Sequence, residues 1–222
     1  MTAATGTAHV VAANVVHGLV PDVLGPLDRS AIDKRPVEGR VRVGELGLDG
    51  DQQVDKKHHG GVDQAVYAYA REDARWWATE LGYDITPGRF GENLTTDGVD
   101  VTGAVLGERW RVGDDGLLLE VSSPRVPCRT FQGWMQEPSW VKRFTAHGAP
   151  GAYLRVIQPG TVGAGDSIEV IHRPRHGVTI GEAFLPRRVD DDLLRRALED
   201  PGVRGAMARA IRRDLAARAR GR

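Results

Sequence analysis

The chain has 222 residues, of which 41% are hydrophobic and 27% charged, a composition typical of globular proteins. Its 30 basic and 30 acidic residues cancel, so no overall charge favours nucleic acid, a membrane surface or an acidic substrate as partner. The single cysteine excludes an intrachain disulfide and fits a reducing cytoplasm, and no apolar run approaches the roughly 18 residues that a membrane helix requires.

The first 174 residues predict mainly β-structure. The N-terminal stretch lacks the basic and apolar regions of a signal peptide. Short runs rich in Val, Tyr, Ile and Leu then alternate with turn residues, and strands are expected at 7–15, 40–48, 64–70, 108–113, 117–123, 152–157 and 167–172. One helix is expected at 71–82, with acidic residues in its first turn and Gly82 as its C-cap. This spacing of strands predicts a mixed or antiparallel β-barrel.

Residues 175–222 predict a separate helical domain after a β-barrel domain at 1–174. Three helices are expected at 179–186, 189–200 and 201–222, the third of them opened by Pro201. An apolar stripe at helical spacing marks the third helix, at Val203, Met207, Ile211 and Leu215. The fold class is therefore mainly β (α+β), with a small three-helix domain at the C-terminus.

The last helix is strongly basic. Between Arg204 and Arg222 the chain carries seven arginines against one acidic residue, Asp214. A charge run of this kind is ordinarily a solvated helix face, and the less common alternative is contact with nucleic acid or a partner protein.

The only cysteine lies in an unusual context, "SSPRVPCRTFQ" at 122–132. Pro124 and Pro127 stiffen the backbone beside Cys128. Arg125 and Arg129 would lower the thiol pKa from its ordinary ~8.5 if their side chains turn inward. A buried structural cysteine normally lies in an apolar pattern, so this context indicates a reactive or metal-binding thiol.

Three further stretches place polar side chains at turns. "KKHHGGVDQAVYAYA" carries His59 before paired glycines, "PGRFGENLTTDG" carries Arg89 beside an FGEN turn, and "AIDKRPVEG" carries Lys34 and Arg35. Each suits binding of an anion or a polar ligand. Each also has an ordinary structural interpretation, respectively a Gly-Gly turn with an exposed histidine, a capped loop and a solvated surface.

Several familiar sites are absent from the sequence. It has no CxxC pair, no P-loop and no GxGxxG after a strand, so zinc-ribbon, thioredoxin and dinucleotide-binding motifs are excluded. A Cys/His hydrolase remains open, because Cys128 with His58 or His59 needs only spatial proximity.

Taken together, these four stretches, with "GAYLRV" and "GTVGAGDSIEVIHRP", resemble the MOSC domain, named for the C-terminal domain of molybdenum cofactor sulfurase. The resemblance is greatest to its bacterial YiiM-like branch and runs from about Ala8 to Arg175. The remaining helices resemble the three-helix domain of that branch.

The resemblance implies a MOSC-type β-barrel that binds the molybdenum cofactor, molybdopterin with Mo, and a cysteine ligand to the metal at Cys128. Enzymes of this group reduce N-hydroxylated compounds such as 6-N-hydroxylaminopurine, with electrons from a separate flavoprotein or iron–sulfur reductase. The chemistry of the residues is compatible, because thiolate is a soft ligand suited to a redox metal and guanidinium groups bind phosphate.

The site residues that follow from the resemblance form two groups. The catalytic group is Cys128, His59 and Asn93. The cofactor-binding group is Lys34, Arg35, His59, Gly60, Gly61, Arg89, Phe90, Gly91, Glu92, Asn93, Arg125 and Pro127. The second histidine of the HHGG turn is preferred to His58, because the family pattern has one histidine there.

Two other functions remain open. In a cofactor-handling or sulfur-carrying protein, Cys128 would carry a persulfide and hydroxylamine turnover would be absent. In a binding module, the arginine-rich tail would contact nucleic acid or a partner protein, and binding would be sensitive to salt.

Overall fold

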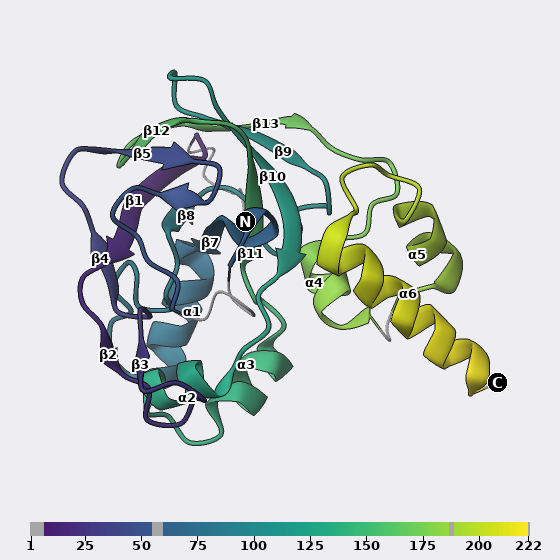
Figure 1. The fold of residues 1–222 in the computed structure, drawn as a ribbon, viewed down its shortest axis with the longest axis horizontal. Coiled ribbons are helices and arrows are strands. Elements are labelled where there is room, and N and C mark those ends of the chain that lie inside the picture. Colours follow the sequence, from purple (N-terminus) through teal and green to yellow (C-terminus); the bar gives the residue numbers. More distant parts are fainter. Residues whose placement is uncertain (1–6, 55–59, 187–188, 222) are drawn as a thin grey trace.

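The computed structural model describes residues 7–54, 60–186 and 189–221 (Figure 1). The fold is a mixed α/β structure built on one large sheet. That sheet has eight strands in the order β13-β9-β10-β11-β7-β8-β1-β4, and all neighbours are antiparallel except the parallel pair β7 and β8. Its strands are β1 (His9–Val16), β4 (Lys34–Pro36), β7 (Val66–Ala70), β8 (Leu94–Asp97), β9 (Arg109–Val112), β10 (Leu117–Pro124), β11 (Ala152–Gln158) and β13 (Ile168–His172).

Two smaller sheets complete the β-structure. One has three strands in the order β12-β5-β6, and the other pairs β2 with β3. These strands are β2 (Val20–Pro21), β3 (Arg29–Ser30), β5 (Arg40–Gly44), β6 (Gly47–Leu48) and β12 (Gly160–Gly163). All seven predicted strand segments therefore contain strands, because their β-branched and aromatic residues suit a half-buried pleated surface.

The large sheet curls back on itself without closing. The backbone of Val10 in β1 accepts a hydrogen bond from Gly165 N and donates one to Asp166 O, just before β13, each at 2.8 Å. The two outer strands of the ladder are nevertheless β13 and β4, and no described ladder joins them. The closed β-barrel that the sequence predicts is therefore not confirmed.

Three helices lie between strands of the large sheet in the chain: α1 (Arg71–Leu81) after β7, and α2 (Arg129–Met135) and α3 (Trp140–His147) after β10. The prediction of α1 is confirmed, and Gly82 caps it with a positive φ of 76°. The prediction of only one helix before residue 174 is wrong, because α2 and α3 also form. Both are short and depend on an aromatic cluster with the sheet, in which Phe131 and Phe144 meet edge to face at 5.1 Å.

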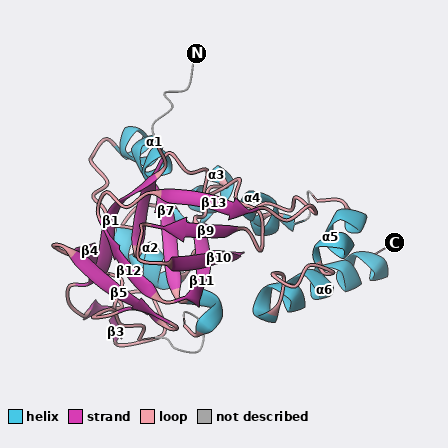
Figure 2. Ribbon diagram, turned by 90° about the horizontal axis from the view of Figure 1, so that it is seen from above, coloured by secondary structure: helices cyan, strands magenta, loops and turns pink. Residues whose placement is uncertain are grey.

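The C-terminal helices are α4 (Ile180–Phe184), α5 (Asp191–Ala197) and α6 (Gly205–Arg220), as the patterning predicts. Figures 1 and 2 show α5 and α6 side by side at one flank of the sheet. The third helix begins at Gly205 and not at Pro201, which lies in a turn. Among the described helices, none has the length and apolar character needed to cross a membrane.

One hydrophobic core continues across the predicted boundary near residue 174. The buried side chains of Leu106, in the turn before β9, and of Trp110 in β9 share a cluster with Val178 and Ile180, and with Ile211 of α6. The backbone also crosses, because Leu106 N donates to Val178 O and Ile180 N donates to Ala104 O. Independence of the two predicted domains therefore stays a prediction.

Candidate functional site

Cys128 lines a cavity of about 100 Å³. The wall is assembled from segments far apart in the sequence. It consists of Asp22, Pro26, Leu27, Arg29, Ser30, Ala31, Ile32, Lys34, Gln52, Gln53, Val54, Gln64, Tyr67, Gly91, Asn93, Arg125, Cys128, Thr130 and Tyr153. Five predicted site residues therefore meet at one place: Lys34, Gly91, Asn93, Arg125 and Cys128.

The position of Cys128 follows from its neighbours. β10 ends at Pro124, and Cys128 then takes an extended conformation, with φ −124° and ψ 174°, directly before α2. Pro127 is buried beside it and does not line the cavity. The half-buried thiol thus sits at the junction of a strand and a helix, both of which pack into the core.

Arg125 supplies the cavity with a buried positive charge. The residue is 5% exposed, and its guanidinium carbon lies 4.2 Å from the ring centroid of Phe131 and 5.3 Å from that of Tyr67. Burial opposes its charge, but Tyr67, Tyr153 and Cys128 favour it and raise the guanidinium pKa. Its Nη1 is buried and has no hydrogen-bond partner among the described residues. A buried donor without a partner is costly, so this atom is suited to an anionic ligand.

Lys34 contributes less free charge than the sequence suggests. Its Nζ lies 2.6 Å from Oδ2 of Asp51, and side-chain exposure is only 9% for the lysine and 6% for the aspartate. Burial lowers the Lys34 pKa, although Asp51 opposes that shift. Arg125 is therefore the buried cation of the wall that no carboxylate among the described residues neutralises in a salt bridge, while Arg29 also lines the cavity but is exposed.

The amide of Asn93 is largely used within the protein. Its Nδ2 donates to Asp51 Oδ2 at 2.8 Å and to Asn14 O at 3.3 Å, while its Oδ1 accepts from Tyr67 N at 3.1 Å. These bonds occupy both amide hydrogens. Asn93 is therefore placed to hold Asp51 and β7 in position, and its predicted contact with a ligand is limited to the remaining oxygen lone pair.

Two residues of the FGEN turn point into the protein and not into the cavity. Glu92 is 3% exposed and accepts hydrogen bonds from Gly88 N at 2.6 Å, from Phe90 N at 3.0 Å and from Thr95 Oγ1 at 2.8 Å. Burial raises its pKa, and these bonds offset part of that shift. Phe90 lies in the aromatic cluster. The acid and the aromatic ring of this turn thus build the loop that presents Gly91 to the cavity.

Two predicted cations also lie outside the cavity wall. Arg89 stacks 4.5 Å from the ring centroid of Trp134. Arg35 pairs with Asp33 at 3.0 Å, and its side chain is 57% exposed. The turn that carries Arg89 packs closely against β4, which carries Arg35, because a Cβ on Gly88 would collide with the backbone of Lys34.

The HHGG turn is described only in part. His58 and His59 lie outside the described residues. Gly60 follows them, and Gly61 adopts φ 88° as it opens the short 3₁₀ helix η1 (Val62–Gln64). Neither glycine lines the cavity, but η1 carries Gln64 into its wall.

Sequence reasoning missed several wall residues. Tyr67 and Tyr153 lie on adjacent strands with ring centroids 5.4 Å apart, and burial raises the pKa of both phenols, so both stay protonated at neutral pH. Gln64 of the wall was also missed, as was Asp51, which pairs with Lys34 of the wall and does not line the cavity itself. The tyrosines look like ordinary strand residues, and Asp51 sits in a plain turn sequence, so no local signal distinguishes them.

The donor set is compatible with a metal-bearing anionic cofactor. A thiol, a guanidinium with an unused donor and two neutral phenols converge on one cavity. A single protein thiolate suits a metal whose other ligands come from the cofactor.

Known proteins resemble this chain in sequence. The MOSC domain family model matches residues 55–169. The chain is 35% identical over 193 residues to Protein YiiM of Escherichia coli, covering 83% of this chain and 84% of the relative. A fungal protein from Gibberella moniliformis named "Reductase" is 34% identical over 156 residues, which cover 68% of this chain and 27% of that protein.

Solved structures show the same fold. The crystal structure of YiiM from Geobacillus stearothermophilus matches with a TM-score of 0.75 and 25% identity, over 94% of this chain and 99% of that one. The crystal structure of YiiM from Escherichia coli matches with a TM-score of 0.69 and 30% identity, over 83% and 89%. The chain therefore belongs to the MOSC domain family and is a homologue of the YiiM proteins.

Proposed function

We propose that this protein is a molybdenum-cofactor-dependent reductase of N-hydroxylated compounds. The MOSC family is associated with the molybdenum cofactor, and one relative is named a reductase. The observation that carries the proposal is that one cavity wall contains both the thiol of Cys128 and Nη1 of Arg125, a buried donor without a hydrogen-bond partner among the described residues.

In this proposal Cys128 holds the metal as thiolate, and Arg125 binds an anionic group of the cofactor. Lys34 and Asp51 form an ion pair beside them with no net charge, and the protonated phenols of Tyr67 and Tyr153 line the same cavity. When bound, the cofactor supplies two electrons, which with two protons convert N–OH into N–H and water.

The electrons would come from a separate flavoprotein or iron–sulfur reductase. The chain has one cysteine, too few to ligate an iron–sulfur cluster, and no dinucleotide fingerprint. We therefore expect no turnover with NAD(P)H alone, and activity after addition of a flavoprotein reductase. Sustained NADPH oxidation coupled to hydroxylamine reduction by the purified chain alone would contradict this expectation.

Elemental analysis for molybdenum, on protein expressed with abundant cofactor, tests the proposal directly. Stoichiometric molybdenum together with reduction of benzamidoxime or 6-N-hydroxylaminopurine is the expected result. Protein loaded with molybdenum that turns over neither compound, and that carries a persulfide on Cys128 by mass spectrometry, would instead indicate a cofactor-handling function.

A further inference from the structure

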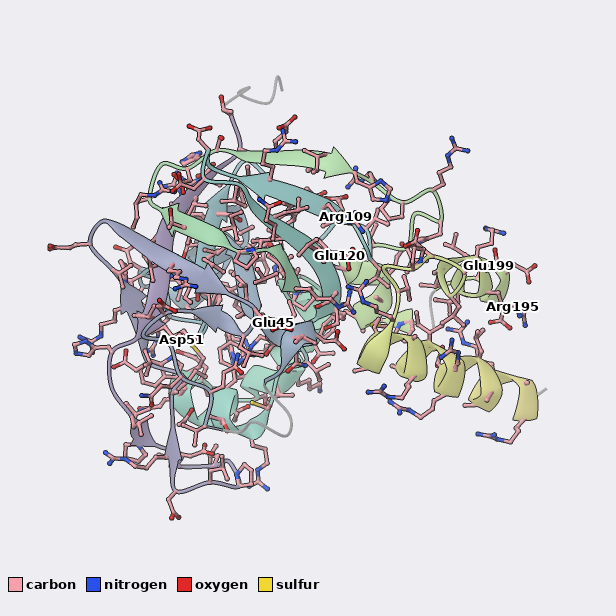
Figure 3. The ribbon with its side chains drawn as sticks, turned by 45° about the horizontal axis from the view of Figure 1, so that its top comes forward. Glu45, Asp51, Arg109, Glu120, Arg195 and Glu199 are labelled. Carbon is pink, nitrogen blue, oxygen red and sulfur yellow. The ribbon has the colours of Figure 1, made fainter. Side chains whose placement is uncertain are left out.

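A buried carboxylate lies where the sheet meets the C-terminal helices. Glu120 of β10 is 0% exposed, and its oxygens contact three arginines: Arg204 at 2.7 Å, and Arg109 and Arg155 at 3.1 Å each. Figure 3 shows Arg109 and Glu120 on the strands that face α6. A charge buried this completely is costly unless it is paired, so these contacts hold the two parts of the chain in one arrangement.

Arg155 extends this network in two directions. Its side chain is 4% exposed, its Nη1 donates to Gly202 O at 2.9 Å, and its Nε donates to Asp63 Oδ1 at 2.6 Å. Gly202 lies in the turn before α6, and Asp63 lies in η1. One guanidinium group therefore links the C-terminal helices to the short helix that follows the HHGG turn.

Asp63 also contacts the beginning of α6 directly. Its Oδ2 accepts a hydrogen bond from Ala206 N at 3.4 Å. Gly205 has φ +60°, and a Cβ at that position would collide with the same carboxylate oxygen. Burial opposes ionisation of Asp63, but Arg155 and the Ala206 N–H outweigh it and lower the pKa of this carboxyl. The carboxylate is thus charged, and the close approach depends on glycine at 205.

The backbone of Asp63 leads into the cavity wall. Its carbonyl accepts a hydrogen bond from Ser122 Oγ at 2.5 Å, and the next residue, Gln64, lines the cavity. Gln64 N donates to Gly61 O at 3.0 Å, and Gln64 O accepts from Gln53 Nε2 at 3.2 Å. Its side-chain Oε1 is buried and has no partner among the described residues, so it is an acceptor available to a ligand.

We propose that the C-terminal helices position this wall of the cavity, with Asp63 as the positioning residue and Gln64 as the residue that contacts the ligand. The contacts run from α6 and the turn before it, through Arg155 and Asp63, to Gln64. The positioning does not depend on the reaction proposed above, because any ligand that fills the cavity meets the same wall.

The variant Gly205→Ala tests the proposal without altering a charge or a cavity residue. Its methyl group displaces the Asp63 carboxylate from the beginning of α6. The matched control is Gly177→Ala, because Gly177 has φ +71° and open space around it, so it reports the strain of positive φ alone. Amide hydrogen exchange in the segment 61–66, measured on the full chain, is the primary readout.

In Gly205→Ala we expect amide exchange in that segment to become at least about tenfold faster, which corresponds to about 1.4 kcal/mol of lost local stability. In Gly177→Ala we expect no change in exchange there. Unchanged exchange at 61–66 in Gly205→Ala would overturn the proposal. If Gly205→Ala does not fold, exchange of the same amides is measured in Asp63→Asn, which keeps the side-chain shape and loses the charge that Arg155 pairs with. Unchanged exchange at 61–66 in that variant would also overturn the proposal.

Kinetics then test the link to the ligand, and this part rests on the proposed reductase function. In the reconstituted enzyme we expect Gly205→Ala to raise KM several-fold with little change in kcat, and to add nothing in a Gln64→Ala background. Additive effects of the two substitutions would overturn the role of Gln64. A protein with no turnover at all would refute the reductase function and leave the exchange result as an independent test.

Discussion

The ammonium group of Lys34 lies 2.6 Å from the carboxylate of Asp51, and both side chains are almost completely buried. The same carboxylate accepts hydrogen bonds from Asn93 Nδ2 at 2.8 Å and from Val16 N at 3.0 Å, so it ties β1, β4 and the loop before β8 together. A buried pair of this kind matters chiefly when it is broken, because removing one partner strands the other charge.

Asp51→Asn is therefore expected to destabilise the fold by about 3 kcal/mol, within the usual range for breaking a buried ion pair. Urea denaturation would measure the loss. Combining it with Lys34→Met should recover part of the stability, because the stranded ammonium is then removed. If the double variant were as unstable as the sum of the two single variants, the pair would not be coupled.

Cys128→Ser is expected to fold normally and to lose both molybdenum and reductase activity. The thiol lies at a cavity surface and the change is nearly isosteric, so little packing is lost, while a protonated hydroxyl suits a soft metal poorly. Thermal melting, molybdenum content and 6-N-hydroxylaminopurine reduction separate the outcomes. A serine variant with full activity would show that the sulfur is not a metal ligand.

Arg125→Gln is expected to reduce molybdenum content about tenfold or more, because it removes the buried charge that suits an anionic group of the cofactor. The matched control is Arg129→Gln, which removes an exposed arginine adjacent to Cys128 that does not line the cavity. Equal loss of molybdenum from the two variants would mean that general charge, and not the cavity donor, retains the cofactor.

The stability of the protein is expected to depend on Asp73 in the acid range. Burial, together with the nearby charges of Glu72 and Asp100, raises the pKa of Asp73 from 3.8 to about 6. Between these pH values the folded state binds more protons than the unfolded state, so stability falls as the pH rises through this window and stays reduced at neutral pH.

Asp73→Asn should therefore stabilise the protein at pH 7 by about 1–2 kcal/mol. The full pKa shift from 3.8 to about 6 would correspond to about 3 kcal/mol, and solvent screening reduces this value because the side chain is partly exposed. The gain should disappear below about pH 4, where Asp73 is protonated in both states. Urea denaturation at pH 4, 5.5 and 7 measures this trend, and a gain independent of pH would argue against titration of Asp73.

Truncation tests the predicted domain boundary. A chain that ends at Pro174 loses Val178 and Ile180, whose burial is worth about 1.5–3 kcal/mol each. A chain that ends at Leu185 keeps both residues and the capping box of α4. We expect the longer truncation product to be soluble and the more stable of the two in thermal melting, and equal melting temperatures would place the boundary at 174 as the patterning predicts.

Much of the secondary structure could be predicted because it depends on neighbours in the sequence. Alternating β-branched and aromatic residues favour the strands, and an acidic first turn and Gly82 favour α1. The helices α2 and α3 were missed because they are 7 and 8 residues long, and burial of Phe131, Trp140 and Phe144 stabilises them, which requires partners from other elements.

The candidate site divides in the same way. The sequence alone determined that Cys128 lies in a stiffened, arginine-flanked loop, since prolines and charges act on their immediate neighbours. Only the tertiary structure decided that Arg125 faces the cavity while Arg35 and Arg89 do not, because packing sets the direction of each side chain. It also decided the link from α6 to Gln64, since a buried charge is satisfied by whichever partners the fold brings within reach.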